Sequence, residues 1–187
     1  MKFASTAALA AALLLAGTAH AETIYAGLSR TTPGEYYADF GSAQHIENGN
    51  SLLSLKLYGG IDLTERYAIE AGYGAFGTLI VSNPAAGSKE EARTSPTLMY
   101  VAGKATLPVG ASFTVFGKLG LAANRVTFEN RNGAPAPSTS AFVRPMYGFG
   151  ADYQLTKHVA AVLEYDYYGA SANFKQQKLE LGVKFSF

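Results

Sequence analysis

Acid–base catalysis in this chain could involve only a few side chains. Three histidines occur in 187 residues, and outside the N-terminal leader the candidates are His45 and His158. A serine nucleophile needs such a base within hydrogen-bond reach, and neither histidine belongs to a His-x-Ser arrangement. Asp39 and Glu47 could join His45 in a loop constellation, but an ordinary acidic loop explains them better. No cluster has metal-ligand spacing and no glycine-rich phosphate loop follows a strand, so we expect no enzyme activity, metal or cofactor.

Lysines and acids recur where every second residue is apolar. The ionisable residues with this placement are Lys56, Glu70, Lys104, Lys118, Arg144, Asp152, Glu164, Asp166, Glu180 and Lys184. An isolated charge in a narrow interior would cost several kcal/mol, so equal numbers of both signs suggest pairing. We predict a salt-bridge network with the pairs Glu70–Lys104, Lys118–Glu164 and Glu180–Lys184. The alternative is that these groups are solvated in a wet interior.

The alternation has a period of two, which is typical of strands with unlike faces. It predicts eight strands, over 23–31, 52–63, 66–81, 97–108, 111–127, 142–155, 158–168 and 178–187. The last segment, "KLELGVKFSF", places leucine, valine and phenylalanine on one face and charges on the other. No window after Thr23 offers about 18 consecutive apolar residues, so helical membrane spans are not expected.

The N-terminal segment, "MKFASTAALAAALLLAGTAHA", has the features of a secretory signal peptide. Lys2 precedes an apolar run, and Ala19-His20-Ala21 is a small-x-small cleavage site. We expect residues 1–21 to be removed and residues 22–187 to form one domain. The mature chain would be formally neutral and has no cysteine, so it offers neither steering towards nucleic acid nor disulfides.

Three features indicate that the charged face points inward. Glycines share that face, and only a narrow barrel of about eight strands needs side chains to be absent there. Short turns, "DLTER", "LPVGAS" and "QLTKH", alternate with long polar loops, which is the asymmetry of outer-membrane barrels. The segments are also long enough for tilted strands to cross hydrocarbon, which takes on the order of 9 to 11 residues. We therefore predict an all-β, eight-stranded, antiparallel up-and-down transmembrane barrel.

The chain resembles the OmpA-like transmembrane barrel family. The resemblance rests on "YAIEAGY" at 67–73, "YGFGADYQLTKHVAAVLEYDYYG" at 147–169 and the ending "LELGVKFSF". It implies that Phe185 and Phe187 act as a signal for the barrel assembly machinery. Larger members continue into a peptidoglycan-binding domain, whereas this sequence stops at Phe187, so tethering of the cell wall by that route is not expected. Val162 replaces a basic residue that the family often carries.

The expected location is the outer membrane, reached through the periplasm, with both chain ends on the periplasmic side. The expected role is structural and surface-interactive: envelope integrity, with long loops available for adhesion to host or surface ligands. A narrow, porin-like solute channel is the alternative, and a secreted soluble barrel is a third class. Expected partners are membrane lipid and lipopolysaccharide, the latter through Arg30 and Arg125, which interrupt the apolar face. The same arginines could be ordinary rim residues in water, and the barrel is expected to be a monomer.

Overall fold

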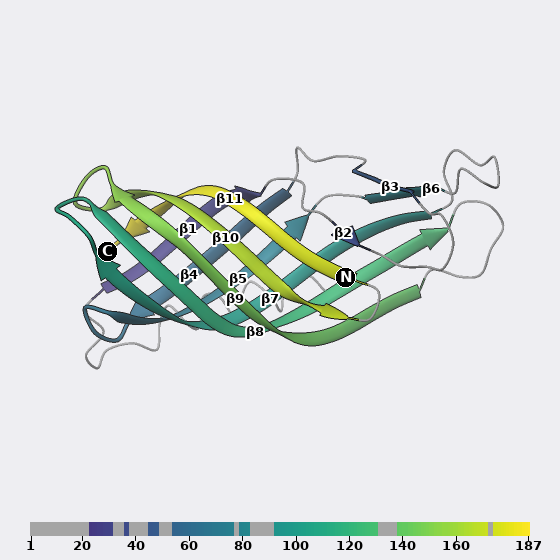
Figure 1. The fold of residues 1–187 in the computed structure, drawn as a ribbon, viewed down its shortest axis with the longest axis horizontal. Helices are drawn as coiled ribbons and strands as arrows, with labels where there is room; N and C mark the ends of the chain where they lie inside the picture. Colours follow the sequence, from purple (N-terminus) through teal and green to yellow (C-terminus); the bar gives the residue numbers. More distant parts are fainter. Residues whose placement is uncertain are drawn as a thin grey trace.

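The computed structural model describes residues 23–31, 36–37, 45–48, 54–76, 79–82, 92–130, 138–171 and 174–187. Eight long strands form a closed antiparallel barrel (Figure 1). They are β1 (Thr23–Thr31), β4 (Ser54–Asp62), β5 (Tyr67–Phe76), β7 (Ala92–Pro108), β8 (Phe113–Asn130), β9 (Ser138–Gln154), β10 (Val159–Ser171) and β11 (Phe174–Ser186). The short strands are β2 (Tyr36–Tyr37), β3 (His45–Asn48) and β6 (Leu79–Ser82). No helix in these ranges is long and apolar enough to span a membrane.

The ring of eight strands closes completely through hydrogen bonds. Each long strand pairs antiparallel with the next, and β11 returns to β1 from Tyr25↔Ser186 to Thr31↔Glu180. The backbone N–H of Phe187 also donates to the carbonyl of Ile24 at 2.9 Å. Lipid offers the backbone no hydrogen-bond partners, so a continuous ladder of this kind is what a membrane-spanning sheet requires.

The predicted strand boundaries agree best at the tight turns and least at the opposite end. There, β7, β8 and β9 continue for 17 or 18 residues, beyond the predicted limits. The segment predicted as a single strand over 66–81 is described as β5 and β6, and 77–78 between them lie outside the described residues. Ala75 faces Thr97 and Leu79 faces Thr94, so the register with β7 shifts by one residue between these two pairs, as it does at a bulge.

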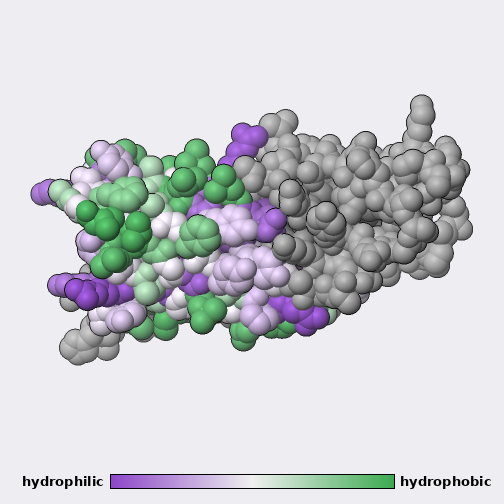
Figure 2. All heavy atoms as spheres, in the orientation of Figure 1, coloured by the Kyte–Doolittle hydropathy of each residue, from purple (hydrophilic) through white to green (hydrophobic). Residues whose placement is uncertain are grey.

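The apolar faces of the strands point outward, as predicted. Leu119 is 71% exposed and Leu181 is 65% exposed, whereas Lys56 and Glu70 are almost inaccessible. Figure 2 shows apolar side chains over the outer surface of the strands, with hydrophilic residues near the tight turns. Such an inverted distribution is expected when the solvent around the sheet is hydrocarbon.

Glycine and aromatic side chains on neighbouring strands fit together inside the barrel. A Cβ added to Gly27 would meet the ring of Tyr58, and one added to Gly60 would meet the ring of Tyr25. The same relation holds for Gly72 with Tyr100 and Gly150 with Phe116, and within β5 a Cβ on Gly74 would meet the ring of Phe76. The missing side chains therefore provide the space that the rings fill, which supports the inference drawn from the glycines of the charged face.

Towards the long-loop end, β9 continues beyond its pairing with β10. There it forms one edge of a sheet that extends past the barrel (Figure 1). Pairing of β9 with β10 ends at Tyr147↔Tyr167, and from Ser138 to Met146 the described partner of β9 is β8 alone. Two features modify this edge. Pro145 has no N–H to donate, and the guanidinium of Arg144 donates to the carbonyl of Val143 at 3.1 Å.

We expect Gly120→Ala to destabilise the barrel and Gly103→Ala to leave it almost unchanged. A Cβ at Gly120 would meet the Val101 carbonyl and lie 2.6 Å from the Cα of Ala102, which are backbone atoms that cannot rotate away. Gly103 faces outward, with its nearest neighbour at 3.9 Å. Overpacking of this kind typically costs about 1–3 kcal/mol. Urea unfolding in lipid vesicles measures both variants, and equal stability would contradict the packing described.

Candidate functional site in the barrel lumen

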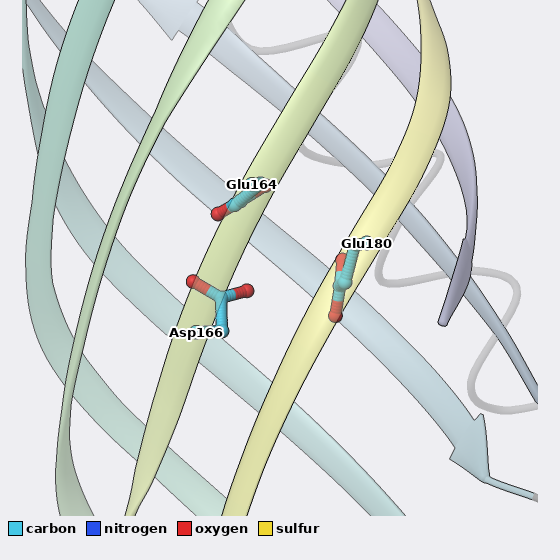
Figure 3. A group of neighbouring side chains, drawn as sticks. All are labelled: Glu164, Asp166 and Glu180. Atoms are coloured by element: carbon cyan, nitrogen blue, oxygen red, sulfur yellow. The ribbon is translucent and has the colours of Figure 1, made fainter. Parts of the chain in front are cut away.

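Lys56 occupies the centre of a cluster of carboxylates in the lumen. It projects from β4, and its ammonium lies 3.0 Å from Glu164 and 2.8 Å from Asp166 on β10. It also forms an ion pair with Glu180 on β11. Figure 3 shows the three acids converging from these two adjacent strands. Three different carboxylates therefore contact the Lys56 ammonium, and the Lys56 side chain is not exposed to solvent.

The three carboxylates are close enough together to resemble a metal site. One oxygen from each of Glu164, Asp166 and Glu180 lies within 4.8 Å of the others. The neighbouring cations are lysines, however, and the remaining polar contacts come from hydroxyls: Tyr168 donates to Asp166 at 2.7 Å and Ser29 donates to Glu180 at 3.0 Å. Lys56 therefore supplies the positive charge that such a cluster requires, and the donor set fits an internal ion-pair network.

Lys118 links this cluster to Glu70 on the facing side of the barrel. Its ammonium is 2.7 Å from Glu70 and is ion-paired with Glu164. Glu70 also accepts hydrogen bonds from the hydroxyl of Tyr25 at 3.0 Å and from that of Tyr100 at 2.7 Å. These contacts join β5, β8 and β10, which are not sequential neighbours in the ring.

Like charges lie side by side along the wall, and the attractive contacts come from other strands. Lys104 faces Lys118 in the β7–β8 ladder, and Glu164 faces Glu180 in the β10–β11 ladder. Directly opposed like charges on neighbouring strands are destabilising on their own. Each group therefore depends for its stability on partners from other strands, such as Glu70, which lies 3.7 Å from Lys104.

The predicted pairs are formed in two cases out of three. Glu70 lies beside Lys104 and Lys118 beside Glu164, but the predicted Glu180–Lys184 pair is wrong. Positions four apart on a strand are separated by about 13 Å, so these two side chains find different partners. Lys184 pairs with Asp152 near the tight turns, while Glu180 pairs with Lys56.

Lys178 was missed by the sequence analysis, and the assignment of Arg144 to the charged network stays a prediction. Arg144 is half-buried near the long-loop end, and its guanidinium lies 5.5 Å from the centre of the Phe142 ring. Lys178 is 1% exposed, and its ammonium lies 4.6 Å from the centre of the Phe76 ring. Its position two residues from Glu180 on the same row was the available signal. With Lys178 included, the described lumen contains five lysines and five carboxylates.

Apolar side chains close the lumen between the ion network and the long-loop end. Phe76, Leu98, Met146 and Tyr168 are each no more than 3% exposed. The Tyr168 ring lies 6.1 Å from that of Phe76 and 6.4 Å from that of Tyr100. The barrel interior is therefore filled both by paired charges and by a layer of apolar and aromatic groups.

The other predicted site residues lie on the outer surface or at the turns. Arg30 and Arg125 are both exposed, but on β1 and β8, which are four strands apart in either direction around the ring. Phe185 and Phe187 are 46% and 78% exposed at the tight-turn end. Other exposed aromatic residues also lie there: Tyr67, Phe113 and Tyr153.

The histidines have no catalytic geometry in the described residues. The ring Nδ1 of His158 lies 3.1 Å from the carbonyl of Ser186, next to the end of β11. His45 and Glu47 are on β3, where only the backbone is described, and Asp39 lies outside the described residues, as does the predicted leader 1–21.

A closed antiparallel barrel with a lipid-compatible exterior and a charged, filled interior defines a transmembrane β-barrel of the outer-membrane class. The family model described as "Outer membrane protein beta-barrel domain" matches residues 6–187, and the chain belongs to this family. The protein is therefore located in the outer membrane. No curated protein sequence matches the chain.

Solved structures of small outer-membrane barrels share the fold. The solid-state NMR structure of AlkL in lipid bilayers superposes with a TM-score of 0.64 at 13% identity, over 92% of each chain. OprG from Pseudomonas aeruginosa gives 0.60 at 14% identity, over 88% of this chain and 94% of that one. Ail, the attachment invasion locus protein of Yersinia pestis, gives 0.56 at 12% identity, over 88% and 97%.

Replacing Lys56 should destabilise the barrel more than replacing Lys104. Lys56→Met leaves three buried carboxylates without their common cation, and losing one partner of a buried pair typically costs about 3–5 kcal/mol. Lys104→Met leaves Glu70 with Lys118 and two tyrosine hydroxyls. Urea unfolding in vesicles compares the two variants, with the exposed turn residue Lys157→Met as a control. A smaller loss for Lys56→Met would contradict its central role.

The pair Lys184–Asp152 should show coupling in a double-mutant cycle. Oδ2 of Asp152 contacts Lys184, and its Oδ1 accepts no hydrogen bond in the described residues. Lys184→Met therefore leaves a buried carboxylate unpaired, whereas adding Asp152→Asn removes that charge. We expect the double variant to unfold at higher urea than Lys184→Met. Strictly additive free energies would mean that the pair contributes nothing.

Proposed function

We propose that this protein is a closed outer-membrane scaffold that presents loops for surface attachment, without catalytic activity and without a solute path. The filled lumen is the observation that carries the proposal. Lys56, Glu70 and Asp166 are no more than 1% exposed, and an apolar layer lies beyond them. A channel needs a hydrated route with sites that bind ions weakly enough for release, and these charges already bind one another.

The long-loop end supports a role in attachment. β7, β8 and β9 each have 17 or 18 residues, while a tilted strand needs only about 9–11 to cross the hydrocarbon. The additional length extends β8 and β9 as a paired sheet beyond the hydrocarbon, up to Phe128 and Ser138. The Yersinia pestis protein Ail, which has the same fold, has been crystallised with the heparin analogue sucrose octasulfate. A saccharide or polyanion is therefore a reasonable first ligand class to test here.

The remaining expectations form part of the same proposal. The barrel functions as a monomer surrounded by lipid, because its exposed apolar surface is distributed around all the strands. Phe185 and Phe187 serve the barrel assembly machinery during biogenesis. The narrow solute channel is the alternative, and electrical recording separates it from the scaffold.

We expect the purified barrel to give small, rare events in planar bilayers, since passage would require several buried ion pairs to separate. In parallel, cells expressing the protein should attach to a sulfated-glycan surface more than cells lacking it. A variant in which 131–137 is replaced by a short Gly-Ser linker should remain folded, shown by heat-modifiable gel mobility, and attach less. Steady large conductance would favour the channel, and unchanged attachment would refute the adhesive role of this connection.

A further inference from the structure

One side of the barrel carries a positive charge within an otherwise apolar outer surface. The outward residues of β1 are Ile24, Ala26, Leu28 and finally Arg30. Arg30 faces Leu55 of β4 on one side and Leu181 of β11 on the other, and these leucines are 43% and 65% exposed. Arg30 is therefore bordered by side chains that contact lipid.

The position of Arg30 along β1 sets its depth in the membrane. It is the eighth of nine residues counted from the tight-turn end, and a strand crosses the hydrocarbon in about 9–11 residues. Its Cα therefore lies at the outer end of the hydrocarbon rather than above the membrane. The side chain can extend further outward along the leucines and bring its guanidinium to the headgroups.

Among the described residues, no acidic side chain neighbours Arg30 on the outer surface. Within the described residues, the outward positions of β1, β4 and β11 include no aspartate or glutamate. An arginine facing lipid is destabilising, most at the midplane and less near the interface. A phosphate group in the adjacent headgroup layer would supply the missing countercharge, and a guanidinium can bind it through two parallel hydrogen bonds.

We propose that Arg30 is a binding site for a phosphate of an outer-leaflet glycolipid of the lipid A type. The lipid-contacting leucines around it hold the acyl chains, so that the guanidinium meets the phosphorylated sugar directly above them. The site is independent of whether the lumen conducts, because all its residues lie on the outer face.

Arg125 provides a matched contrast. It is the thirteenth residue of β8 from the tight-turn end and faces Thr97 and Ala141 rather than exposed leucines. This position lies beyond the length needed to cross the hydrocarbon. Arg125 is therefore a rim residue in water. Of the two arginines that the sequence analysis predicts to contact lipopolysaccharide, we assign a lipid site to Arg30 alone.

The test measures binding of lipid A to the folded full-length barrel in detergent micelles. We expect Arg30→Gln to weaken binding about tenfold, the loss of one charge-assisted contact, while Arg125→Gln binds like the wild type. Lipid A stripped of its phosphates should bind the wild type as weakly as phosphorylated lipid A binds Arg30→Gln. Arg30→Lys should retain part of the affinity, because charge remains without the bidentate geometry.

Heat-modifiable gel mobility shows whether each variant is folded before binding is measured. Equal binding by wild type and Arg30→Gln would overturn the proposal. A comparable loss in Arg125→Gln would also overturn it, since it would indicate general attraction to positive charge. Undiminished binding of dephosphorylated lipid A would show that acyl-chain contact alone explains the association.

Discussion

The structure depends on one constraint: backbone N–H and C=O groups surrounded by hydrocarbon must bond to each other. The pairing of β11 with β1 meets this requirement by removing both edges of the eight-stranded sheet. Once the ring is closed, the outer residues of every strand must be compatible with lipid, and the inner residues must share a narrow volume. The apolar exterior and the crowded interior are thus two results of the same closure.

Inside the ring, small side chains lie beside large ones, and positive side chains lie beside negative ones. Glycines such as Gly27 and Gly60 provide room for tyrosines on the adjoining strands, and the hydroxyl of one of them, Tyr25, in turn donates to Glu70. Lysines grouped on one part of the wall, Lys104 beside Lys118, are both neutralised by Glu70, and Lys118 also pairs with Glu164. Because the Lys118 contacts connect β8 with β5 and β10, which are not its neighbours, they stabilise the shape of the whole cylinder as well as its wall.

The sequence predicts the strands and their faces because alternation is a local property of each segment. Partner choice in the lumen is not local, since it depends on the stagger with which the strands close. For this reason Glu180 was paired with Lys184, which is near in sequence, although Lys56 from β4 is its partner. Lys178 satisfies the same alternation as Glu180, but only the closed barrel shows that its side chain is buried inside, against the Phe76 ring. The register of β6 with β7 differs by one residue from that of β5 with β7, which no composition signal records.

The stretch of β9 above Tyr147 has a further consequence for neighbouring copies in a crowded membrane. Exposed strand edges can join end to end or side to side into larger sheets, and proline or charged residues at an edge oppose this. Pro145 cannot donate a hydrogen bond, and Arg144 occupies the carbonyl of Val143. Adjacent barrels can therefore reach high density on the cell surface without forming intermolecular β-sheets through this strand.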